Sequence, residues 1–296
     1  MAKKKTVFMC KSCGYDTAKW MGKCPSCGEF NTFTEETAPS ANDKKGSEYR
    51  NFGEGSSASP LADIELKAEE RLFTGISEAD RVFGGGIVKG SLVLLGGEPG
   101  AGKSTLALMI ADRIAGTGLK TLYVSGEESS SQIKMRAERI GARSKNLLLL
   151  IETGVEKIAG AIETEKPGLV VVDSIQTVYK DDVDAAAGSM SQIRESCAHL
   201  MYAAKRTGVP VIIIGHVTKD GAIAGPKMLE HMVDAVMYFE AEESFRFKIL
   251  RAVKNRFGSI NEIGVFEMTG TGLCEVKSPS KALLDAAGTG KPGSAV

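Results

Sequence analysis

Short apolar runs alternate along most of the chain with segments whose apolar residues recur every three or four positions. The runs, each about the length of one buried strand, cover residues 92–95, 121–124, 147–151, 169–172 and 211–214. The helix-period segments between them lie at residues 106–114, 133–140, 158–162 and 190–204. This alternation predicts an α/β fold with a mostly parallel central sheet. Two further strands are expected at residues 235–239 and 245–252.

The same pattern divides the chain into four parts. Residues 1–32 hold four cysteines and form a small zinc-binding module, whereas residues 61–277 carry the strand and helix pattern of one larger domain. Residues 33–60 are rich in Ser, Glu, Lys, Gly and Ala without a sustained period, which predicts a flexible linker. Residues 278–296 read as a tail. We therefore expect the small module to be tethered to the larger domain rather than fused to it.

Composition narrows the class of protein without identifying a partner. The 37 basic and 37 acidic residues cancel, so any nucleic-acid surface must be local. Residues 3–5 are basic, as at the start of a signal peptide, but the apolar run at residues 7–9 is far too short for one. No span of 18 apolar residues occurs, which gives no expectation of a membrane partner. We expect a cytoplasmic protein.

A phosphate-binding motif follows the first apolar run. Residues 97–104 fit GxxxxGK[ST] at every fixed position, and the predicted strand and helix on either side disfavour a chance match in a glycine-rich turn. Glycines let backbone N–H groups curl around a polyphosphate. We expect Lys103 to bridge the β- and γ-phosphates of ATP and Ser104 to bind Mg²⁺. The predicted nucleotide-binding residues are Gly97, Glu98, Pro99, Gly100, Ala101, Gly102, Lys103, Ser104, Thr105 and Asp173.

Polar side chains follow three other predicted strands. Asp173 ends the run at residues 169–172 as in a Walker B motif, and we expect it to hold Mg²⁺ through water opposite Ser104. Glu127 is placed to polarise the attacking water, although Glu127 and Glu128 also suit the start of the next helix. His216 is a candidate sensor of ATP against ADP, and the alternative is a structural histidine.

Two cations stand two residues apart late in the chain. Lys254 and Arg256 lie in an extended stretch, where side chains at this spacing point to the same side. They are too far along the chain to fit easily in their own phosphate site, so they are candidates to reach the γ-phosphate held by a neighbouring copy. The alternative is a solvated basic turn.

Four cysteines form two C-x2-C pairs separated by ten residues. Two facing pairs close a tetrahedral four-sulfur site with no open position, which predicts structural Zn²⁺ bound by Cys10, Cys13, Cys24 and Cys27. Because the module is so short, it cannot bury enough apolar surface to fold alone. Metal binding would therefore supply its folding free energy. A pair of disulfides and an iron–sulfur cluster remain as alternatives.

The order of these motifs resembles one family. A four-cysteine motif, residues 97–105, the Val-Ser-Gly-Glu-Glu-Ser block at residues 124–129 and Lys-Asn-Arg-Phe-Gly at residues 254–258 are the signature order of bacterial RadA (Sms) proteins, and the resemblance covers residues 8–277. It implies a RecA-like P-loop ATPase core behind a small zinc ribbon or knuckle. It also implies Lys103, Glu127, His216, Lys254 and Arg256 as catalytic residues, the last two acting in trans.

The resemblance further implies partners and an activity. Such proteins are DNA-dependent ATPases, helicase-like, that bind single-stranded and branched DNA and drive branch migration together with RecA, assembled as hexameric rings. The matching DNA loops are residues 179–191, which are acidic here, and 217–227. Family members continue into a Lon-protease-like domain that helps assembly, and this chain stops before it. The alternative function is an ATP-switched DNA clamp or recruitment protein without motor activity. A metabolic kinase fits poorly, because it leaves the zinc module and the Lys-Asn-Arg-Phe-Gly block without a role.

Overall fold

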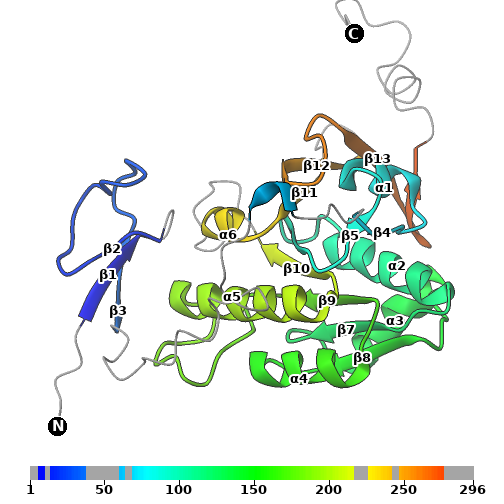
Figure 1. The fold of residues 1–296 in the computed structure, drawn as a ribbon, viewed down its shortest axis with the longest axis horizontal. Helices are drawn as coiled ribbons and strands as arrows, with labels where there is room; N and C mark the ends of the chain where they lie inside the picture. Colours follow the sequence, from blue (N-terminus) through cyan, green and yellow to red (C-terminus); the bar gives the residue numbers. More distant parts are fainter. Residues whose placement is uncertain are drawn as a thin grey trace, which may run out of the picture.

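One nine-stranded sheet organises the larger part of the molecule. The computed structural model describes residues 6–10, 14–37, 60–63, 69–216, 226–241 and 247–276. The strand order in the sheet is β14-β13-β12-β11-β6-β10-β9-β7-β8 (Figure 1). The six strands from β11 to β8 are parallel, and the three at the other end are antiparallel. The predicted α/β fold with a mostly parallel sheet is therefore confirmed.

The apolar runs of the sequence become the parallel strands. These are β6 (Leu92–Gly97), β7 (Thr121–Ser125), β8 (Leu147–Ile151), β9 (Leu169–Asp173), β10 (Val211–His216) and β11 (Ala235–Ala241). The antiparallel end is built from β12 (Phe247–Asn255), β13 (Ile263–Thr269) and β14 (Gly272–Glu275). A short two-stranded sheet precedes β6, from β4 (Arg71–Leu72) and β5 (Ile87–Val88), after the 3-10 turn η2 (Leu61–Asp63).

Helices cover both faces of the sheet and divide its core into two clusters. Residues of the first three helices pack with one set of strand residues, and residues of the last three pack with the alternate set. Along β6, for example, Val93 and Leu95 belong to the first cluster and Leu92 and Leu94 to the second. The first layer is α1 (Ser77–Phe83), α2 (Lys103–Gly116) and α3 (Ser130–Ile140). The second is α4 (Val155–Glu165), α5 (Met190–Thr207) and α6 (Pro226–Met232).

The longest helix shows how local sequence sets these elements. Ser189 caps α5 by accepting a hydrogen bond from the backbone N–H of Gln192, and Gly208 ends the helix in the left-handed conformation. Buried residues recur along α5 at helical spacing and include Cys197, which packs as a small hydrophobic side chain. Burial raises the pKa of the Cys197 thiol to about 12, so the thiol stays protonated.

The N-terminal module is a three-stranded antiparallel ribbon in the order β2-β1-β3. It consists of β1 (Thr6–Cys10), β2 (Asp16–Thr17) and β3 (Phe33–Thr37). Strand β3 falls in the segment that we assigned to the linker from residue 33, and Phe33 packs on Cys10 and Cys24. The ordered module therefore extends to Thr37, because Phe33 supplies part of its small core. The rest of the expected linker, residues 38–59, and the tail at residues 278–296 lie outside the described residues.

The ribbon packs against the larger domain through α6, which lies beside it in Figure 1. Met9 is buried and belongs to the same hydrophobic cluster as Met228 and Leu229 of α6. Gly14 approaches α6 so closely that a Cβ on it would lie 2.8 Å from the Met228 sulfur. We expected a module that is only tethered. The described contact differs from that expectation because the ribbon buries Met9 against α6.

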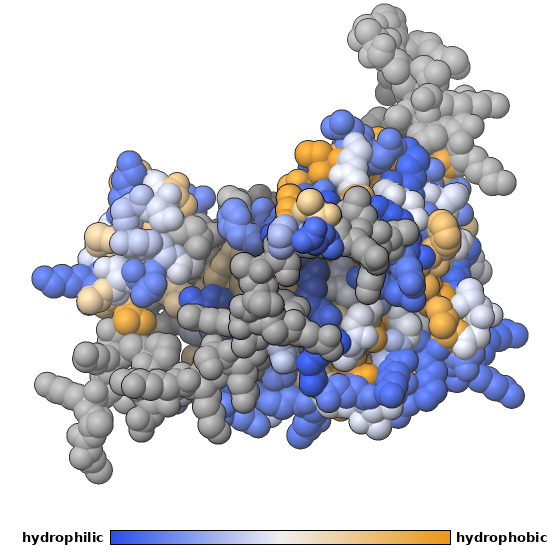
Figure 2. Space-filling view, viewed as in Figure 1, coloured by the Kyte–Doolittle hydropathy of each residue, from blue (hydrophilic) through white to orange (hydrophobic). Residues whose placement is uncertain are grey.

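Exposed hydrophobic side chains are scattered over the larger domain. Figure 2 shows a mostly hydrophilic face with hydrophobic groups over the end of the sheet that carries β12 and β13. Val253, Ile260 and Ile263 are exposed at this end. Among the described residues, no helix is both long enough and apolar enough to cross a membrane.

Candidate nucleotide site

The phosphate-binding motif forms the turn between β6 and α2. Gly97 ends β6, residues 98–102 make the turn, and Lys103, Ser104 and Thr105 begin α2. Gly97 and Gly102 have φ values of 146° and 108°, in the region that favours glycine. A Cβ on Gly97 would lie 2.1 Å from the carbonyl oxygen of Phe239, so β11 leaves no room for a side chain there. The motif therefore adopts the strand–turn–helix conformation that its sequence predicts.

Lys103 folds back onto this turn. Its ammonium donates hydrogen bonds of 2.8 Å to the carbonyl oxygens of Gly97 and of Glu98, and the residue is 3% exposed. Burial lowers the pKa of Lys103 to about 8, although the charges of Asp173 and Glu127 act in the opposite direction. A cation held by two neutral carbonyl groups is ready to exchange them for the charged oxygens of a phosphate.

Asp173 ends β9 beside this turn. Its Oδ2 accepts a hydrogen bond of 2.6 Å from the Tyr123 hydroxyl on the neighbouring strand β7. Ile213 of β10 pairs in register with both Leu94 of β6 and Val172 of β9, so Asp173 lies level with the end of β6, where the phosphate turn begins. Mg²⁺ prefers oxygen ligands. The Ser104 hydroxyl, at the start of α2, and the Asp173 carboxylate, at the end of β9, supply such donors at the same edge of the sheet, with β10 between their strands. The residues present therefore suit a nucleotide-bound Mg²⁺.

Glu127 follows β7 and lies against two groups from other strands. The Ser174 hydroxyl donates a hydrogen bond to Glu127 Oε1, and His216 Nε2 lies 3.5 Å from the same oxygen. Hydrogen bonding from His216, and then from Ser174, holds the pKa of Glu127 below its ordinary value despite partial burial. Glu127 is therefore ionised at neutral pH. The alternative, that it only begins a helix, is disfavoured because α3 begins at Ser130 and is capped by Ser129.

His216 is the last residue of β10. Gln176, after β9, approaches the His216 carbonyl oxygen with its side-chain nitrogen at 3.5 Å. Gln176 Oε1 and His216 Nδ1 are buried without a hydrogen-bond partner among the residues that the structure describes. Polar atoms of this kind suit a further ligand at the strand ends. The expected DNA loop that follows covers residues 217–227, and residues 217–225 of it lie outside the described residues.

Lys254 and Arg256 lie far from this turn. Lys254 pairs in register with Val236, which pairs with Leu94, so it is level with the middle of β6 and two strands away. Arg256 N donates to the Asp234 carbonyl oxygen, next to the start of β6. The phosphate turn begins after the last residue of β6. Both cations are therefore displaced from their own phosphate turn toward the opposite edge of the sheet.

Both cations contact the segment that joins α6 to β11. Lys254 Nζ donates to the carbonyl oxygens of Glu230 at 2.6 Å and Val233 at 2.8 Å. Burial, and then the charge of Arg256, lower the pKa of Lys254. Arg256 Nη1 pairs with Asp234 Oδ1 at 3.2 Å, yet 54% of the Arg256 side chain is exposed. The alternative of a solvated basic turn is therefore disfavoured, because both cations are held against one segment of the protein. Of the two side chains, that of Arg256 is the more accessible.

Sequence reasoning missed the residues that hold these groups. Asp234 is 2% exposed, and it accepts hydrogen bonds from Lys205, Arg256 and the backbone of Leu92. Tyr123 reads as an ordinary strand residue. Two features of the sequence could have pointed to these residues. Asp234 is an acidic residue immediately before an apolar strand, and Tyr123 carries a hydroxyl two residues before a strand end.

Three of the four predicted zinc ligands come together in the ribbon. The ligand atoms of Cys10, Cys24 and Cys27 lie within 4.8 Å of one another, and Cys10 Sγ is 3.7 Å from Cys27 Sγ. Cys13 lies outside the described residues. The grouped thiols are the donors that Zn²⁺ prefers in structural sites, so the cluster suits that ion.

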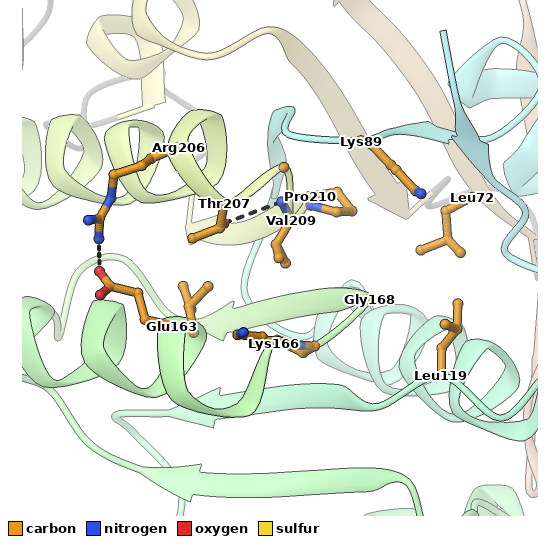
Figure 3. A pocket seen from close by; sticks show the side chains of 13 residues that line it. Leu72, Lys89, Leu119, Glu163, Lys166, Gly168, Arg206, Thr207, Val209 and Pro210 are labelled. Carbon is orange, nitrogen blue, oxygen red and sulfur yellow. Dashed lines mark hydrogen bonds and ion pairs between the residues drawn. The ribbon is translucent and has the colours of Figure 1, made fainter. Parts of the chain in front are cut away.

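A separate cavity opens at the other edge of the sheet. It encloses about 660 Å³ between segments that precede β6, β7, β9 and β10, including Lys89, Leu119, Pro167 and Pro210. Figure 3 shows Leu72 and Leu119 on one side and the ion pair of Arg206 with Glu163 on the other. No residue of the predicted nucleotide site lines this cavity, because that site lies at the carboxyl ends of the strands.

Comparison with known proteins identifies both parts of the chain. A family described as AAA domain matches residues 58–222, and a family described as Rubredoxin metal binding domain matches residues 8–35. The DNA repair protein RadA of Bacillus subtilis is 51% identical over the whole chain, and that of Listeria monocytogenes is 52% identical. The chain spans 65% and 64% of the length of these two relatives.

A solved structure supports the fold. The crystal structure of the RadB recombinase superposes with a TM-score of 0.54 at 23% identity, over 70% of this chain and 100% of that one. This likeness shows a RecA-like core, as the motif order implies. The chain belongs to the AAA-domain family, and its resemblance to the bacterial RadA proteins is confirmed along its whole length.

Proposed function

We propose that this protein is a DNA-dependent, helicase-like ATPase of recombinational DNA repair. It binds single-stranded and branched DNA in the cytoplasm and drives branch migration together with RecA. The observation that carries the proposal is the grouping of Lys103, Asp173 and Glu127 at the edge of the sheet where β6, β9 and β7 end. The relatives named DNA repair protein RadA support the choice of DNA as partner.

Binding begins with an exchange of hydrogen bonds at the phosphate turn. The Lys103 ammonium leaves the carbonyl oxygens of Gly97 and Glu98 for the phosphate oxygens of ATP. Ser104, and Asp173 through water, would hold Mg²⁺, which when bound would neutralise charge on those oxygens. The first turn of α2 adds its backbone N–H groups. These groups bind and orient the nucleotide.

Glu127 then positions the attacking water. An ionised carboxylate with a lowered pKa is a weak base, so its main contribution is to accept a hydrogen bond and fix the water in line. Ser174 and His216 restrain the same Glu127 oxygen. His216 also leads directly into residues 217–225, so its contact with Glu127 couples the nucleotide to that segment. This is the sensor role that we assign to His216.

A neighbouring copy completes the site. Lys254 and Arg256 lie away from their own phosphate turn, so they serve the γ-phosphate of another protomer in a homo-oligomeric ring. Arg256 is the better placed of the two, because over half of its side chain is exposed. A cation delivered in trans contributes about 10³–10⁵ in rate, so isolated protomers hydrolyse ATP slowly.

The test combines two assays on the purified protein. ATP turnover is measured with and without single-stranded DNA, and branch migration of a three-strand intermediate is measured with RecA, using ATP or a non-hydrolysable analogue. We expect DNA to stimulate turnover and only ATP to support strand movement. An ATP-switched clamp would instead be favoured if the protein bound nucleotide and associated with the strands equally well with ATP and with the analogue, but moved no strand directionally. Lack of nucleotide binding would overturn both functions.

A further inference from the structure

Tyr123 and Asp173 share one face of the sheet. Strands β7 and β9 are parallel neighbours, with Ser125 paired to Asp173 in register. Paired residues of neighbouring strands point to the same face, and residues two apart on one strand do so as well. Tyr123, two residues before Ser125, therefore lies on the Asp173 face, and it packs in the hydrophobic cluster beneath α2.

The contact between them is short and shielded from water. The Tyr123 hydroxyl donates to Asp173 Oδ2 at 2.6 Å, Tyr123 is 1% exposed and Asp173 is 7% exposed. Burial, and then the negative charge of Asp173, raise the pKa of Tyr123 well above its ordinary value. The phenol therefore keeps its proton at every pH at which the protein works, and it remains a donor.

The hydrogen bond leaves the two carboxylate oxygens unequal. Oδ2 is occupied by Tyr123, whereas Oδ1 accepts no hydrogen bond from the part of the chain that the structure describes. A hydrogen bond to one oxygen of a buried carboxylate restricts its rotation, and this narrows the range of directions that the other oxygen takes. Hydrogen bonds to a metal-binding carboxylate from groups behind it tune both its orientation and its affinity for the metal.

We propose that Tyr123 is a positioning residue, which fixes the Asp173 carboxylate through Oδ2 so that Oδ1 is held ready for nucleotide-bound Mg²⁺. The inference rests on the proposed nucleotide site and adds to it a residue that contacts neither nucleotide nor metal. Its effect is confined to steps that need the metal. Nucleotide binding without Mg²⁺ is independent of Tyr123.

The test is a Mg²⁺ titration of nucleotide binding, read by the anisotropy of a fluorescent ADP. Tyr123→Phe removes only the hydroxyl. For this variant, we expect the Mg²⁺ concentration that gives half of the Mg²⁺-dependent gain in ADP affinity to rise about 10- to 100-fold. ADP binding in EDTA should be unchanged. The matched control is Tyr202→Phe on α5, whose ring lies 5.5 Å from Arg206. This control should follow the wild-type curve.

A double-mutant cycle separates positioning from a general structural effect. Since Tyr123 acts through Asp173, Tyr123→Phe should shift the Mg²⁺ curve no further when Asp173→Asn is already present. Equal shifts in both backgrounds, or a Tyr123→Phe curve identical to wild type, would overturn the inference. A wild-type protein that binds no ADP would instead overturn the proposed nucleotide site.

A measurement on the wild-type side chains covers the case in which Tyr123→Phe does not fold. Fluorotyrosine is incorporated, and the Tyr123 fluorine resonance is assigned with a conservative variant of each other tyrosine. We expect this resonance to move when Mg²⁺ is added to the ADP complex. A resonance unmoved by Mg²⁺ would contradict the positioning role.

Discussion

The ammonium of Lys254 donates a hydrogen bond of 2.8 Å to the carbonyl oxygen of Val233, just after α6. Lys254→Ala removes this donor and the bond to Glu230, so we expect the free energy of unfolding to fall by about 1–2 kcal/mol. We also expect nucleotide binding to survive and DNA-stimulated turnover to be lost. Urea denaturation, ADP anisotropy and ATPase assays measure these three effects. Turnover at the wild-type level would exclude a role for Lys254 in trans.

Mixing two inactive variants tests the trans arrangement directly. Lys103→Ala removes the phosphate contact, and Arg256→Ala removes the cation offered to a neighbour. In a mixed ring, an Arg256→Ala protomer beside a Lys103→Ala protomer rebuilds one complete site. Random assembly of equal amounts should give activity at about one quarter of the sites. Each variant alone is the control, and a mixture no more active than its components would show that both residues serve one protomer.

The lowered pKa of Lys103 makes nucleotide binding dependent on pH. With a pKa of about 8 in the protein without nucleotide, Lys103 is mostly charged below pH 8 and mostly neutral above it. Phosphate favours the charged form, so binding above pH 8 takes up a proton, and the affinity for ADP should fall about tenfold from pH 7 to pH 9.

Calorimetry in buffers of different ionisation heat measures this proton uptake. Lys89→Gln, at the opposite edge of the sheet, is the control and should show the same fall. An affinity that stays constant over this range would contradict a neutral Lys103 at high pH.

Two glycines of the phosphate turn should respond differently to alanine. A Cβ on Gly97 meets the Phe239 carbonyl oxygen at 2.1 Å, whereas a Cβ on Gly100 meets nothing within 4 Å, and both have positive φ. We expect Gly97→Ala to cost about 3 kcal/mol or more, from strain and overpacking together, and Gly100→Ala about 1 kcal/mol from strain alone. Urea unfolding measures both, and equal losses would contradict the close approach of β11.

The contact between the ribbon and α6 should protect the zinc site. Met228→Ala removes the side chain that meets Gly14, so the ribbon loses packing. Because metal binding and folding of so small a module are coupled, we expect zinc to transfer to a chelator a few times faster. Met135→Ala changes an exposed methionine on α3 and should leave the rate unchanged. Equal rates for Met228→Ala and the wild type would show that the ribbon does not depend on α6.

The sequence predicts the strand-end residues well because one topology rule brings them together. Lys103, Asp173, Glu127 and His216 each follow a different apolar run, and the carboxyl ends of parallel strands meet at one edge. The order of strands in the sheet could not be predicted from these runs, since many pairings bury the same apolar residues.

Other contacts leave little trace in the sequence. The acceptors of Lys254 are backbone carbonyl oxygens, which every residue possesses. Tyr123 looks like a core residue until Asp173 is seen beside it. Met9 packs on Met228, more than 200 positions away, and apolar spacing does not report such long-range contacts.

The separation of Arg256 from its own phosphate turn gives any assembly a direction. Each copy would offer a cation at one end and receive one at the other, which is a heterologous contact. In an open string of copies, the nucleotide at one end always lacks a cation from a neighbour. In a closed circle, every nucleotide receives one. The share of competent sites would thus grow with the length of the string and become complete only on closure.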